Sequence, residues 1–329
     1  MQASREEQIE RYRGLIQPAL PLVQTLYPYG FAVRVSTNSE RVLNLLNEEW
    51  RSFERRFSNE PIKVNVEAVE YGTNELPLEP VFTLRDGLMI NVADPVNMSI
   101  GDLRRGVSHV TLSPGALQSP MWMQYFLVCS APLCHIAGSL ALPVHAACVA
   151  WNGRGVLLCG ESGDGKSTLS FACARAGWTY VTDDATYFAH GSGDSCLAVG
   201  NCYQIRFRPS ASELFPEVEG REVTPRAAGK PSIEIPVHSL PEIEFAPEAH
   251  IENIVFLNRR DKSPAELSLY DKDAARDFMR RSMFGTPKGM LQHEETMERL
   301  LAEVQVWEMR YSDLDWAIKR LQRLVVEGE

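Results

Sequence analysis

The spacing of hydrophobic residues predicts that the chain begins with a mixed region of helices and short strands. Apolar and polar residues alternate, as in half-buried strands, over residues 30–36, 62–69, 81–84, 88–92 and 107–112. Asp86 and Gly87 separate the third and fourth of these runs and indicate a hairpin turn. Helical spacing is found over residues 5–16 and in the stripe Val42, Leu45, Leu46, Trp50, Phe53 and Phe57. These patterns predict an α+β domain over residues 1–115.

From residue 116 to residue 329, longer apolar runs alternate with helical patterns and predict an α/β domain. Residues 119–138 are predicted to form an apolar helix. Two strands, over residues 144–151 and 155–159, are joined by an Asn152-Gly153 turn, and a third strand covers residues 178–182 after a helix that ends at Gly177. Later patterns predict strands over residues 203–208 and 251–257 and helices over residues 273–283, 294–307 and 312–326.

The segment GESGDGKST fits the phosphate-binding pattern GxxxxGK[ST] at every fixed position. It lies between a predicted buried strand and a predicted helix, which is the context that this pattern requires. The backbone of such a loop and the start of the helix present amide hydrogens to phosphate oxygens. In this site Lys166 would reach the β- and γ-phosphates and Ser167 would be a ligand of Mg²⁺. We therefore predict a nucleotide-binding site made of Gly160, Glu161, Ser162, Gly163, Asp164, Gly165, Lys166, Ser167 and Thr168.

Two adjacent carboxylates, Asp183 and Asp184, follow the strand predicted over residues 178–182. If this strand and the strand before the loop are parallel in one sheet, as a right-handed crossover implies, their carboxyl ends meet at the same edge. One carboxylate could then hold the metal or orient Lys166, while the other accepts the proton of an attacking hydroxyl. An Asx turn or a helix cap is the structural alternative.

Composition narrows the classes of partner. With 33 basic and 43 acidic residues the net charge is −10, which argues against nucleic acid or an anionic membrane as a partner. The seven cysteines form no CxxC pair and mostly lie in apolar runs, as reduced cysteines of a cytoplasmic protein do. The N-terminal residues are charged, with no signal-peptide core. Because proline and histidine interrupt the apolar residues 125–151, we expect a buried helix and strand there, and no membrane span.

Three spaced features resemble the catalytic core of HPr kinase/phosphorylase and of related serine kinases. They are Val144-His145-Ala146, the run VLLCGESGDGKSTL, and the run AGWTYVTDD that ends at Asp184. In that family a histidine precedes a GxSGxGKS loop, and a strand after the helix closes with two aspartates. The resemblance implies a P-loop kinase domain with a mixed sheet and flanking helices, which uses ATP and Mg²⁺ to phosphorylate a serine of a protein or peptide.

Carried over to this sequence, the resemblance also implies roles for single residues. His145, Lys166 and Asp184 would be catalytic, with Asp184 as the base that takes the proton of the hydroxyl. Ser167 would be a magnesium ligand, and Asp183 would support the metal or the lysine.

Departures from the family pattern concern the metal and the reverse reaction. The family's Glu-Ile-Arg strand, whose glutamate helps to bind metal, corresponds here to Gln204-Ile205-Arg206, and the Pro-Gly-Arg-Asn segment linked to phosphorolysis is missing. Arg206 and Arg208 share one face of the predicted strand, and Lys230 lies in a loop rich in proline and glycine. Each of these cations is a candidate contact for phosphate or substrate, or else an exposed residue or part of a structural ion pair.

The sequence therefore predicts an ATP-dependent kinase that acts on a hydroxyl group. The acceptor is left open between a protein or peptide and a small molecule, and a regulatory module that binds ATP without transferring phosphate is a further alternative. Residues 1–115 show no ligand or catalytic spacing, so packing, assembly into a homo-oligomer and substrate recruitment all remain open as their role.

Overall fold

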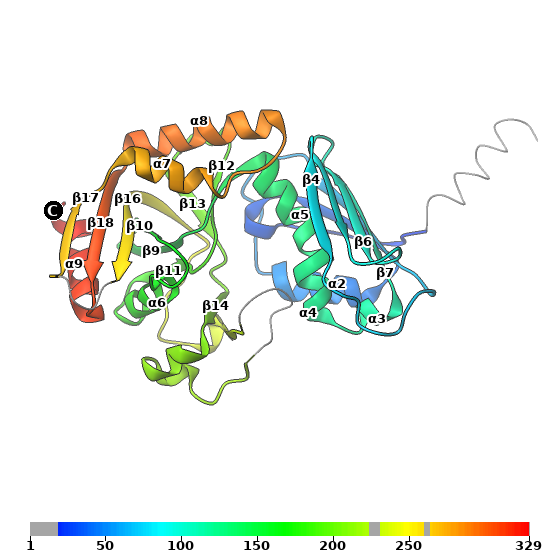
Figure 1. Ribbon diagram of the computed structural model, residues 1–329, viewed down its shortest axis with the longest axis horizontal. Helices are drawn as coiled ribbons and strands as arrows, with labels where there is room; N and C mark the ends of the chain where they lie inside the picture. Colours follow the sequence, from blue (N-terminus) through cyan, green and yellow to red (C-terminus); the bar gives the residue numbers. More distant parts are fainter. Residues whose placement is uncertain (1–18, 224–230, 260–263, 329) are drawn as a thin grey trace, which may run out of the picture. The chain divides into compact units, whose positions relative to one another are not determined.

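The computed structural model describes residues 19–223, 231–259 and 264–328 (Figure 1). The helix predicted over residues 5–16 and the candidate Lys230 lie outside these ranges. The chain divides into two compact units, Met1–Cys134 and His135–Glu329, and each is built on a mixed β-sheet.

The sheet of the first unit has seven strands in the order β1-β2-β3-β7-β6-β5-β4. β2, β3 and β7 are parallel neighbours, and the other pairs are antiparallel. The five strands predicted here are confirmed, and so is the hairpin turn at Asp86 and Gly87, whereas β1 and β6 were not predicted. The strands are β1 (Leu22–Leu26), β2 (Val33–Thr37), β3 (Ile62–Ala68), β4 (Val81–Arg85), β5 (Leu88–Val92), β6 (Met98–Asp102) and β7 (Val107–Leu112).

In the first unit, α2 (Glu40–Trp50) packs on β1 and β2. The prediction that its stripe continues through Phe53 and Phe57 is wrong, because the helix ends at Trp50. Beyond that point the backbone N–H of Phe57 donates to the carbonyl of Gly30, and the Phe57 ring stacks on Phe31 with the centroids 4.3 Å apart. The apolar spacing continues beyond Trp50, but contacts with Gly30 and Phe31 draw the chain out of the helix.

The apolar residues 119–138 form a nearly continuous helix, as predicted. It consists of α4 (Pro120–Trp122), η2 (Met123–Val128), α5 (Ser130–His135) and η3 (Ile136–Leu140), and it follows the short helix α3 (Pro114–Leu117). Among the described residues, Pro120–Leu140 is the one helical stretch long and apolar enough to cross a membrane, and 61% of its most apolar window is buried within the protein. Such burial is also typical of a core helix.

The main sheet of the second unit has nine strands. Its principal order is β11-β9-β10-β16-β13-β12-β8, with β18 paired to β16 and β17 paired to β18. β10, β16 and β18 are parallel, and β9 is antiparallel to both β10 and β11, so β10 and β11 run in the same direction on either side of it. The strands are β8 (Ala141–Val144), β9 (Ala147–Trp151), β10 (Arg154–Cys159), β11 (Thr179–Thr182), β12 (Thr186–Ala189), β13 (Leu197–Gly200), β16 (Glu248–Arg259), β17 (Glu266–Leu269) and β18 (Gln305–Tyr311).

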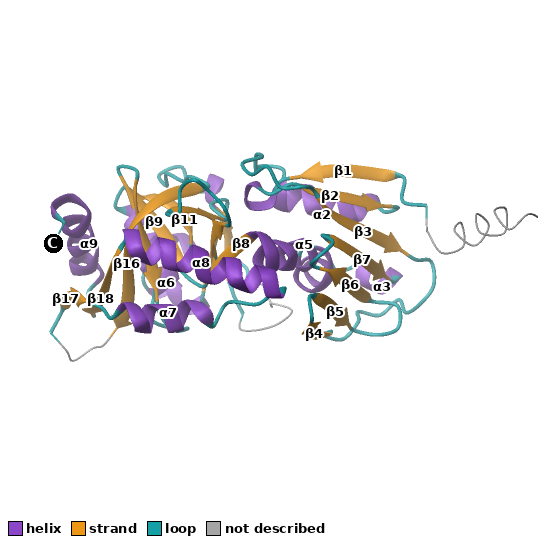
Figure 2. Cartoon of the chain, turned by 90° about the horizontal axis from the view of Figure 1, so that it is seen from above, coloured by secondary structure: helices purple, strands orange, loops and turns teal. Residues whose placement is uncertain are grey.

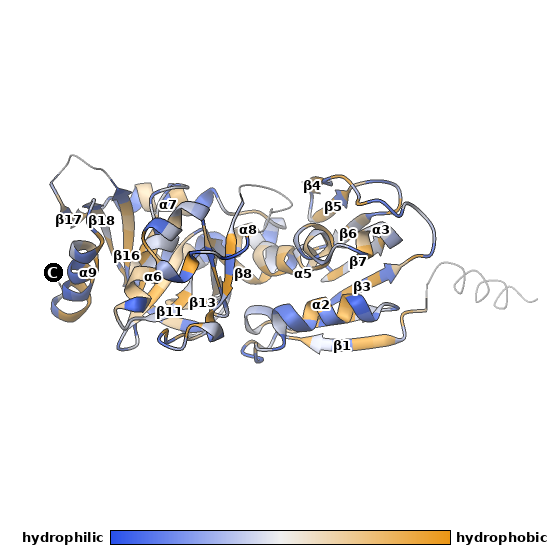
Figure 3. Ribbon diagram, turned by 90° about the horizontal axis from the view of Figure 1, so that it is seen from below, coloured by the Kyte–Doolittle hydropathy of each residue, from blue (hydrophilic) through white to orange (hydrophobic). Residues whose placement is uncertain are grey.

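Helices cover both faces of this sheet, as Figure 1 and Figure 2 show. On one face α6 (Lys166–Arg175) and α9 (Leu314–Glu327) pack on residues such as Val156 and Leu158 of β10. On the other face α7 (Lys272–Arg280) and α8 (Pro287–Glu303) pack on Leu157 and its neighbours. Because successive strand residues point to opposite faces, a strand buried on both sides is apolar throughout, and in Figure 3 β8 and β13 are accordingly coloured as hydrophobic.

A two-stranded sheet of β14 (Gln204–Phe207) and β15 (Ile233–Pro236) completes the second unit. Its apolar residues share a core cluster with Phe171 of α6 and Tyr180 of β11. Four short 3₁₀ helices lie in the connections of the described residues, namely η1 (Pro28–Gly30), η4 (Pro209–Glu213), η5 (Pro216–Val218) and η6 (Val237–Ser239).

Two predictions for the second unit are wrong in part. The strand predicted over residues 144–151 is split, because β8 ends at Val144 and pairs with β12, whereas β9 begins at Ala147 and pairs with β10. The helix predicted over residues 294–307 ends at Glu303, and residues 305–307 belong to β18, since they pair with β16. The predicted Asn152-Gly153 turn between β9 and β10 is confirmed, with positive φ at both residues.

Candidate functional site

The loop predicted to bind phosphate connects the end of β10 to the start of α6. Its turn depends on glycine, since φ is +94° at Gly165, where an added Cβ would lie 2.9 Å from the Tyr311 hydroxyl oxygen. Asp164 braces the loop from inside, because its Oδ2 accepts from the backbone N–H of Glu161 at 2.6 Å and its carbonyl accepts from Tyr311 at 3.3 Å. The loop therefore has a fixed shape that leads into the N-terminus of a ten-residue helix.

Lys166 lies at this helix N-terminus and is only 7% exposed. Its Nζ donates to the carbonyl oxygens of Gly160 at 2.7 Å and Glu161 at 3.1 Å. An ammonium group has three N–H donors, so these two carbonyls account for two of them. Burial lowers the pKa of Lys166, while nearby negative charges, among them Asp184, act in the opposite direction. Together with the helix N-terminus, this ammonium fits a polyphosphate.

Asp183 and Asp184 follow β11, and Asp183 points into the protein. It is 5% exposed, its Oδ1 accepts from the Tyr180 hydroxyl at 3.1 Å, and its Oδ2 accepts from the backbone N–H of Arg206 at 3.1 Å. Burial, and after it the charge of Asp184, raises the pKa of Asp183 to about 6 against the opposing effect of Arg206. The Ser167 hydroxyl lies 3.5 Å from the carbonyl oxygen of Asp183, so the start of α6 meets the end of β11 here.

Asp184 is the more exposed of the two aspartates and meets side chains from two other elements. Its Oδ1 lies 3.2 Å from Nδ1 of His145, and its Oδ2 lies 3.8 Å from the Arg206 guanidinium. The side chains of His145 and Asp184 are 50% and 45% exposed, so both can reach a bound molecule. Since Asp184 also acts on the charge of Lys166, the structure brings His145, Asp184 and Arg206 together beside the phosphate loop.

The break between β8 and β9 explains the position of His145. The chain leaves the β8–β12 pair at Val144 and enters the β9–β10 pair at Ala147, with the N–H of Ala146 donating to the carbonyl of Val144 at 2.9 Å. In a continuous strand buried on both faces His145 would be enclosed. At the break its imidazole is half exposed, whereas Ala146 is fully buried.

Two further residues of this cluster were not predicted from the sequence. Glu234 of β15 lies opposite Arg206, with Oε1 3.2 Å from the guanidinium Nε, and its Oε2 accepts from Gln204 at 2.7 Å. The buried Tyr180 hydroxyl contacts both Asp183 and the carbonyl oxygen of Gln204. Alternation of apolar and polar residues over 232–236 marks a strand, but only its pairing with β14 places Glu234 at the site.

Other candidate residues lie on the loop, on α6 and after β14. Ser162 and Gly163 form the exposed tip of the loop, and Thr168 lies in the first turn of α6. Arg208 is exposed one residue beyond the end of β14. The hydroxyl of Ser167 and the carboxylates of Asp183 and Asp184 are oxygen donors of the kind that Mg²⁺ prefers, so the residues present fit that ion.

Comparisons with known proteins give limited matches. The family model described as SynChlorMet cassette protein ScmC matches residues 111–231, which is less than half of the chain. A comparison with curated proteins found no match. Among solved structures, the HPr(Ser) kinase/phosphatase from Coxiella burnetii is similar with a TM-score of 0.31 and 16% sequence identity, over 56% of this chain and 99% of that one. These matches leave the family of the chain open, and the function is inferred below from the site residues.

Proposed function

We propose that this protein is an ATP- and Mg²⁺-dependent kinase that transfers the γ-phosphoryl group to a hydroxyl, and that the acceptor is a serine of a protein or peptide. The observation that carries the proposal is the placement of Asp184 beside the phosphate loop, with His145 at 3.2 Å and Arg206 at 3.8 Å. A loop that only binds nucleotide needs the lysine and the helix N-terminus. A carboxylate that can accept the proton of the hydroxyl is the additional feature that supports phosphoryl transfer.

Each residue has a defined part in this reaction. Lys166 and the amides of the loop bind and orient the phosphates, and Ser167 binds Mg²⁺, which neutralises charge on the phosphate oxygens. Asp183 has both carboxylate oxygens engaged by protein donors, which hold β11 against β14, and its negative charge would support the metal. Asp184 accepts the proton of the acceptor hydroxyl as its oxygen bonds to the γ-phosphorus, while the bond from that phosphorus to the bridging oxygen breaks and ADP leaves.

His145 and Arg206 position the base. His145 holds Asp184 through its Nδ1, and Arg206, itself tied to Glu234, adds positive charge on the other carboxylate oxygen. Positive charge near a carboxylate favours its ionised form, which is the form that accepts a proton. The choice of serine as acceptor rests on the likeness of the His145, phosphate-loop and Asp183-Asp184 segments to those of serine kinases.

Labelling with radioactive ATP tests this proposal. Purified full-length protein is incubated with γ-labelled ATP, Mg²⁺ and an extract of the cells that produce it. Label in a protein band supports the proposal, and label in small solutes redirects it to a small-molecule acceptor. Release of free phosphate alone, with no labelled product, contradicts kinase activity and favours a regulatory module that binds ATP.

A further inference from the structure

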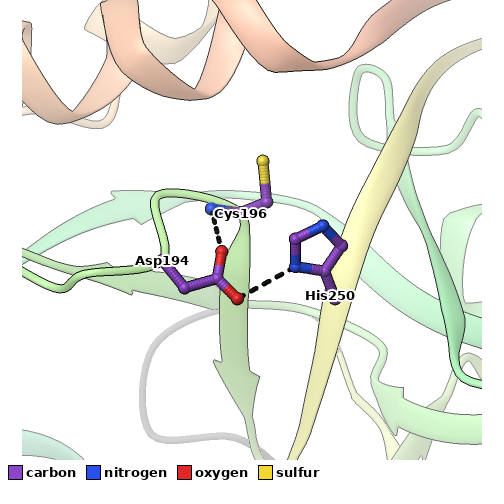
Figure 4. A group of neighbouring side chains, drawn as sticks. All are labelled: Asp194, Cys196 and His250. Carbon is purple, nitrogen blue, oxygen red and sulfur yellow. Dashed lines mark hydrogen bonds and ion pairs between the residues drawn. The ribbon is translucent and has the colours of Figure 1, made fainter.

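A group of side chains with metal-binding chemistry lies in the second unit, outside the nucleotide site. It consists of Asp194, Cys196 and His250, whose ligand atoms all lie within 4.8 Å of one another (Figure 4). Nδ1 of His250 is 2.9 Å from Oδ2 of Asp194, and Oδ1 of Asp194 accepts from the backbone N–H of Cys196 at 2.9 Å. The Asp194 carboxylate thus joins the imidazole of His250 to the backbone of Cys196.

The backbone fixes this group between two strands. Cys196 directly precedes β13, and His250 lies on β16 opposite Leu197, the first residue of β13. The N–H of Ile251 donates to the carbonyl of Cys196 at 2.9 Å, so the segments that carry the sulfur and the imidazole are hydrogen-bonded to each other. His250 thus lies in the sheet, whereas Asp194 and Cys196 lie in the turn that leads into β13.

The group is far from the phosphate loop. His250 is level with Arg154, the first residue of β10, whereas the loop follows Cys159 at the other end of that strand. Five strand steps of about 3.3 Å separate the two ends by about 17 Å. The cluster therefore lies near the start of β10, and the loop follows the end of that strand. The cluster takes no part in the proposed phosphoryl transfer.

The donor set selects the class of metal. A thiolate sulfur, an imidazole nitrogen and a carboxylate oxygen suit Zn²⁺, whereas Mg²⁺ and Ca²⁺ prefer oxygen alone. Cys196 is 1% exposed, whereas the side chains of Asp194 and His250 are 42% and 50% exposed, so the group meets solvent on the side of these two residues.

A further carboxylate supports the site. Glu303, the last residue of α8, has Oε2 3.7 Å from the Cys196 sulfur, and its Oε1 accepts from the hydroxyl of Ser195. It stands next to the position that a fourth ligand would take. Bond lengths of about 2.0 to 2.3 Å place the ligand atoms of tetrahedral zinc roughly 3.3 to 3.8 Å apart, so the cluster has to tighten by about 1 Å at its widest.

We propose that Asp194, Cys196 and His250 bind one Zn²⁺ ion, which joins the start of β13 to β16 and leaves a fourth position for water or Glu303. On binding, the Cys196 thiol releases its proton to solvent and coordinates as the thiolate, and the Asp194 carboxylate turns from the imidazole to the metal. Because the ion links segments that are far apart in the sequence, it stabilises the second unit against unfolding.

Zinc titration of the full-length protein, prepared without a polyhistidine tag and freed of metal by a chelator, tests the proposal. Calorimetry should give one zinc per chain, and Co²⁺ in place of Zn²⁺ should produce the ultraviolet absorption of a cobalt–thiolate bond. The zinc-loaded protein should also melt at a higher temperature than the metal-free protein. A wild-type protein that binds no stoichiometric zinc overturns the proposal.

Matched variants locate the ion. Cys196→Ser and His250→Asn should each weaken zinc binding by more than the roughly 10- to 100-fold that loss of an outer partner costs, and Cys196→Ser should abolish the cobalt–thiolate band. The controls are Cys134→Ser and His238→Asn, whose side chains lie outside the cluster, and both should bind zinc as the wild type does. Lys166→Ala should also keep the zinc site, which separates this proposal from the nucleotide site.

Two ligand variants are needed because one of them can fail to fold. If Cys196→Ser does not fold because a buried residue is changed, the half-exposed His250→Asn still gives the answer. Undiminished zinc binding by folded His250→Asn, or an equal loss in the two control variants, contradicts the assignment.

Discussion

Asp183 and Asp184 are neighbours in the sequence, yet their carboxylates have different surroundings. Asp183 is buried and receives hydrogen bonds from Tyr180 and from the backbone of Arg206. Asp184 is exposed and lies between His145 and Arg206. Two carboxylates whose environments differ in this way can take different parts in one reaction. The exposed carboxylate is the one that can accept a substrate proton.

The burial of Asp183 predicts a pH dependence of stability. Its pKa of about 6 in the folded protein lies above the ordinary value of 3.8, so the folded state binds the proton more tightly than the unfolded state. This stabilising contribution is complete below about pH 4 and is lost as the pH rises through about 6. It is of the order of 2 to 3 kcal/mol, at about 1.4 kcal/mol per pKa unit.

Denaturant unfolding of the wild type and of Asp183→Asn from pH 4 to pH 7 would measure this effect, since an amide does not titrate there. The wild type should lose stability relative to the variant over that interval. If the two curves stay parallel, the carboxylate of Asp183 is not held as the structure indicates.

Gln204 leads to a prediction about the reverse reaction, the phosphate-dependent removal of phosphate from the product. An amide oxygen binds Mg²⁺ less well than a carboxylate, and the amide nitrogen of Gln204 is already bonded to Glu234 at 2.7 Å. We expect little phosphate-dependent removal of phosphate from the product, a reaction in which phosphoserine and inorganic phosphate would give serine and pyrophosphate. Pyrophosphate formed at a rate near that of the forward reaction would show that Gln204 does not have this effect.

At the scale of elements, the strand, loop and helix from β10 to α6 carry the proposed nucleotide site, and Gly165 is a constrained point of its loop. We predict that Gly165→Ala abolishes ATP binding, because φ is +94° and the new Cβ would meet Tyr311 at 2.9 Å. Gly153→Ala is the matched control, since its φ is +81° but no atom lies within 4 Å of the new Cβ.

Both alanine variants should lose stability by the roughly 1 to 2 kcal/mol that a left-handed conformation costs a residue with a side chain. Only Gly165→Ala should lose ATP affinity, as measured by calorimetry. Equal ATP affinity in the two variants would mean that the loop does not hold the phosphates.

Lys166 gives a second test at the N-terminus of α6. Replacement by alanine removes the ammonium that would face the phosphates, so we expect ATP affinity or turnover to fall steeply. The circular dichroism spectrum should stay that of the wild type, because the fold does not depend on this charge. Unchanged ATP affinity together with unchanged phosphoryl transfer would exclude Lys166 from the site.

The elements also show which parts of the structure the sequence could predict. The strand, loop and helix around residues 160–168 and the Asn152-Gly153 turn depend on neighbouring residues, and their local structure was predicted correctly. The helix predicted to reach Trp307 fails because Val304 and Val306 fit a strand as well as a helix, and pairing with β16 decides between them. Glu234 was missed for the same reason, since its position depends on a partner strand 30 residues away.

At the scale of the whole molecule, the candidate residues of the nucleotide site and of the zinc site all lie in the unit His135–Glu329. The first unit offers a seven-stranded sheet and, in its described part, no group of three or more His, Cys, Asp or Glu side chains that could hold a metal ion. Acceptor recognition generally resides in loops and added domains that carry no fixed pattern. The identity of the acceptor therefore has to come from labelling experiments on the full chain.

The Asp184→Asn variant of the full-length protein tests the central claim most directly, because the amide keeps the shape of the side chain and removes the proton acceptor. ATP affinity and the labelling of acceptor are measured on the same preparation. We predict that ATP binding persists while phosphoryl transfer falls by about 10²- to 10⁴-fold, the usual contribution of a general base. Transfer at the wild-type rate, with ATP binding intact, would contradict the role of Asp184 and with it the proposed kinase mechanism.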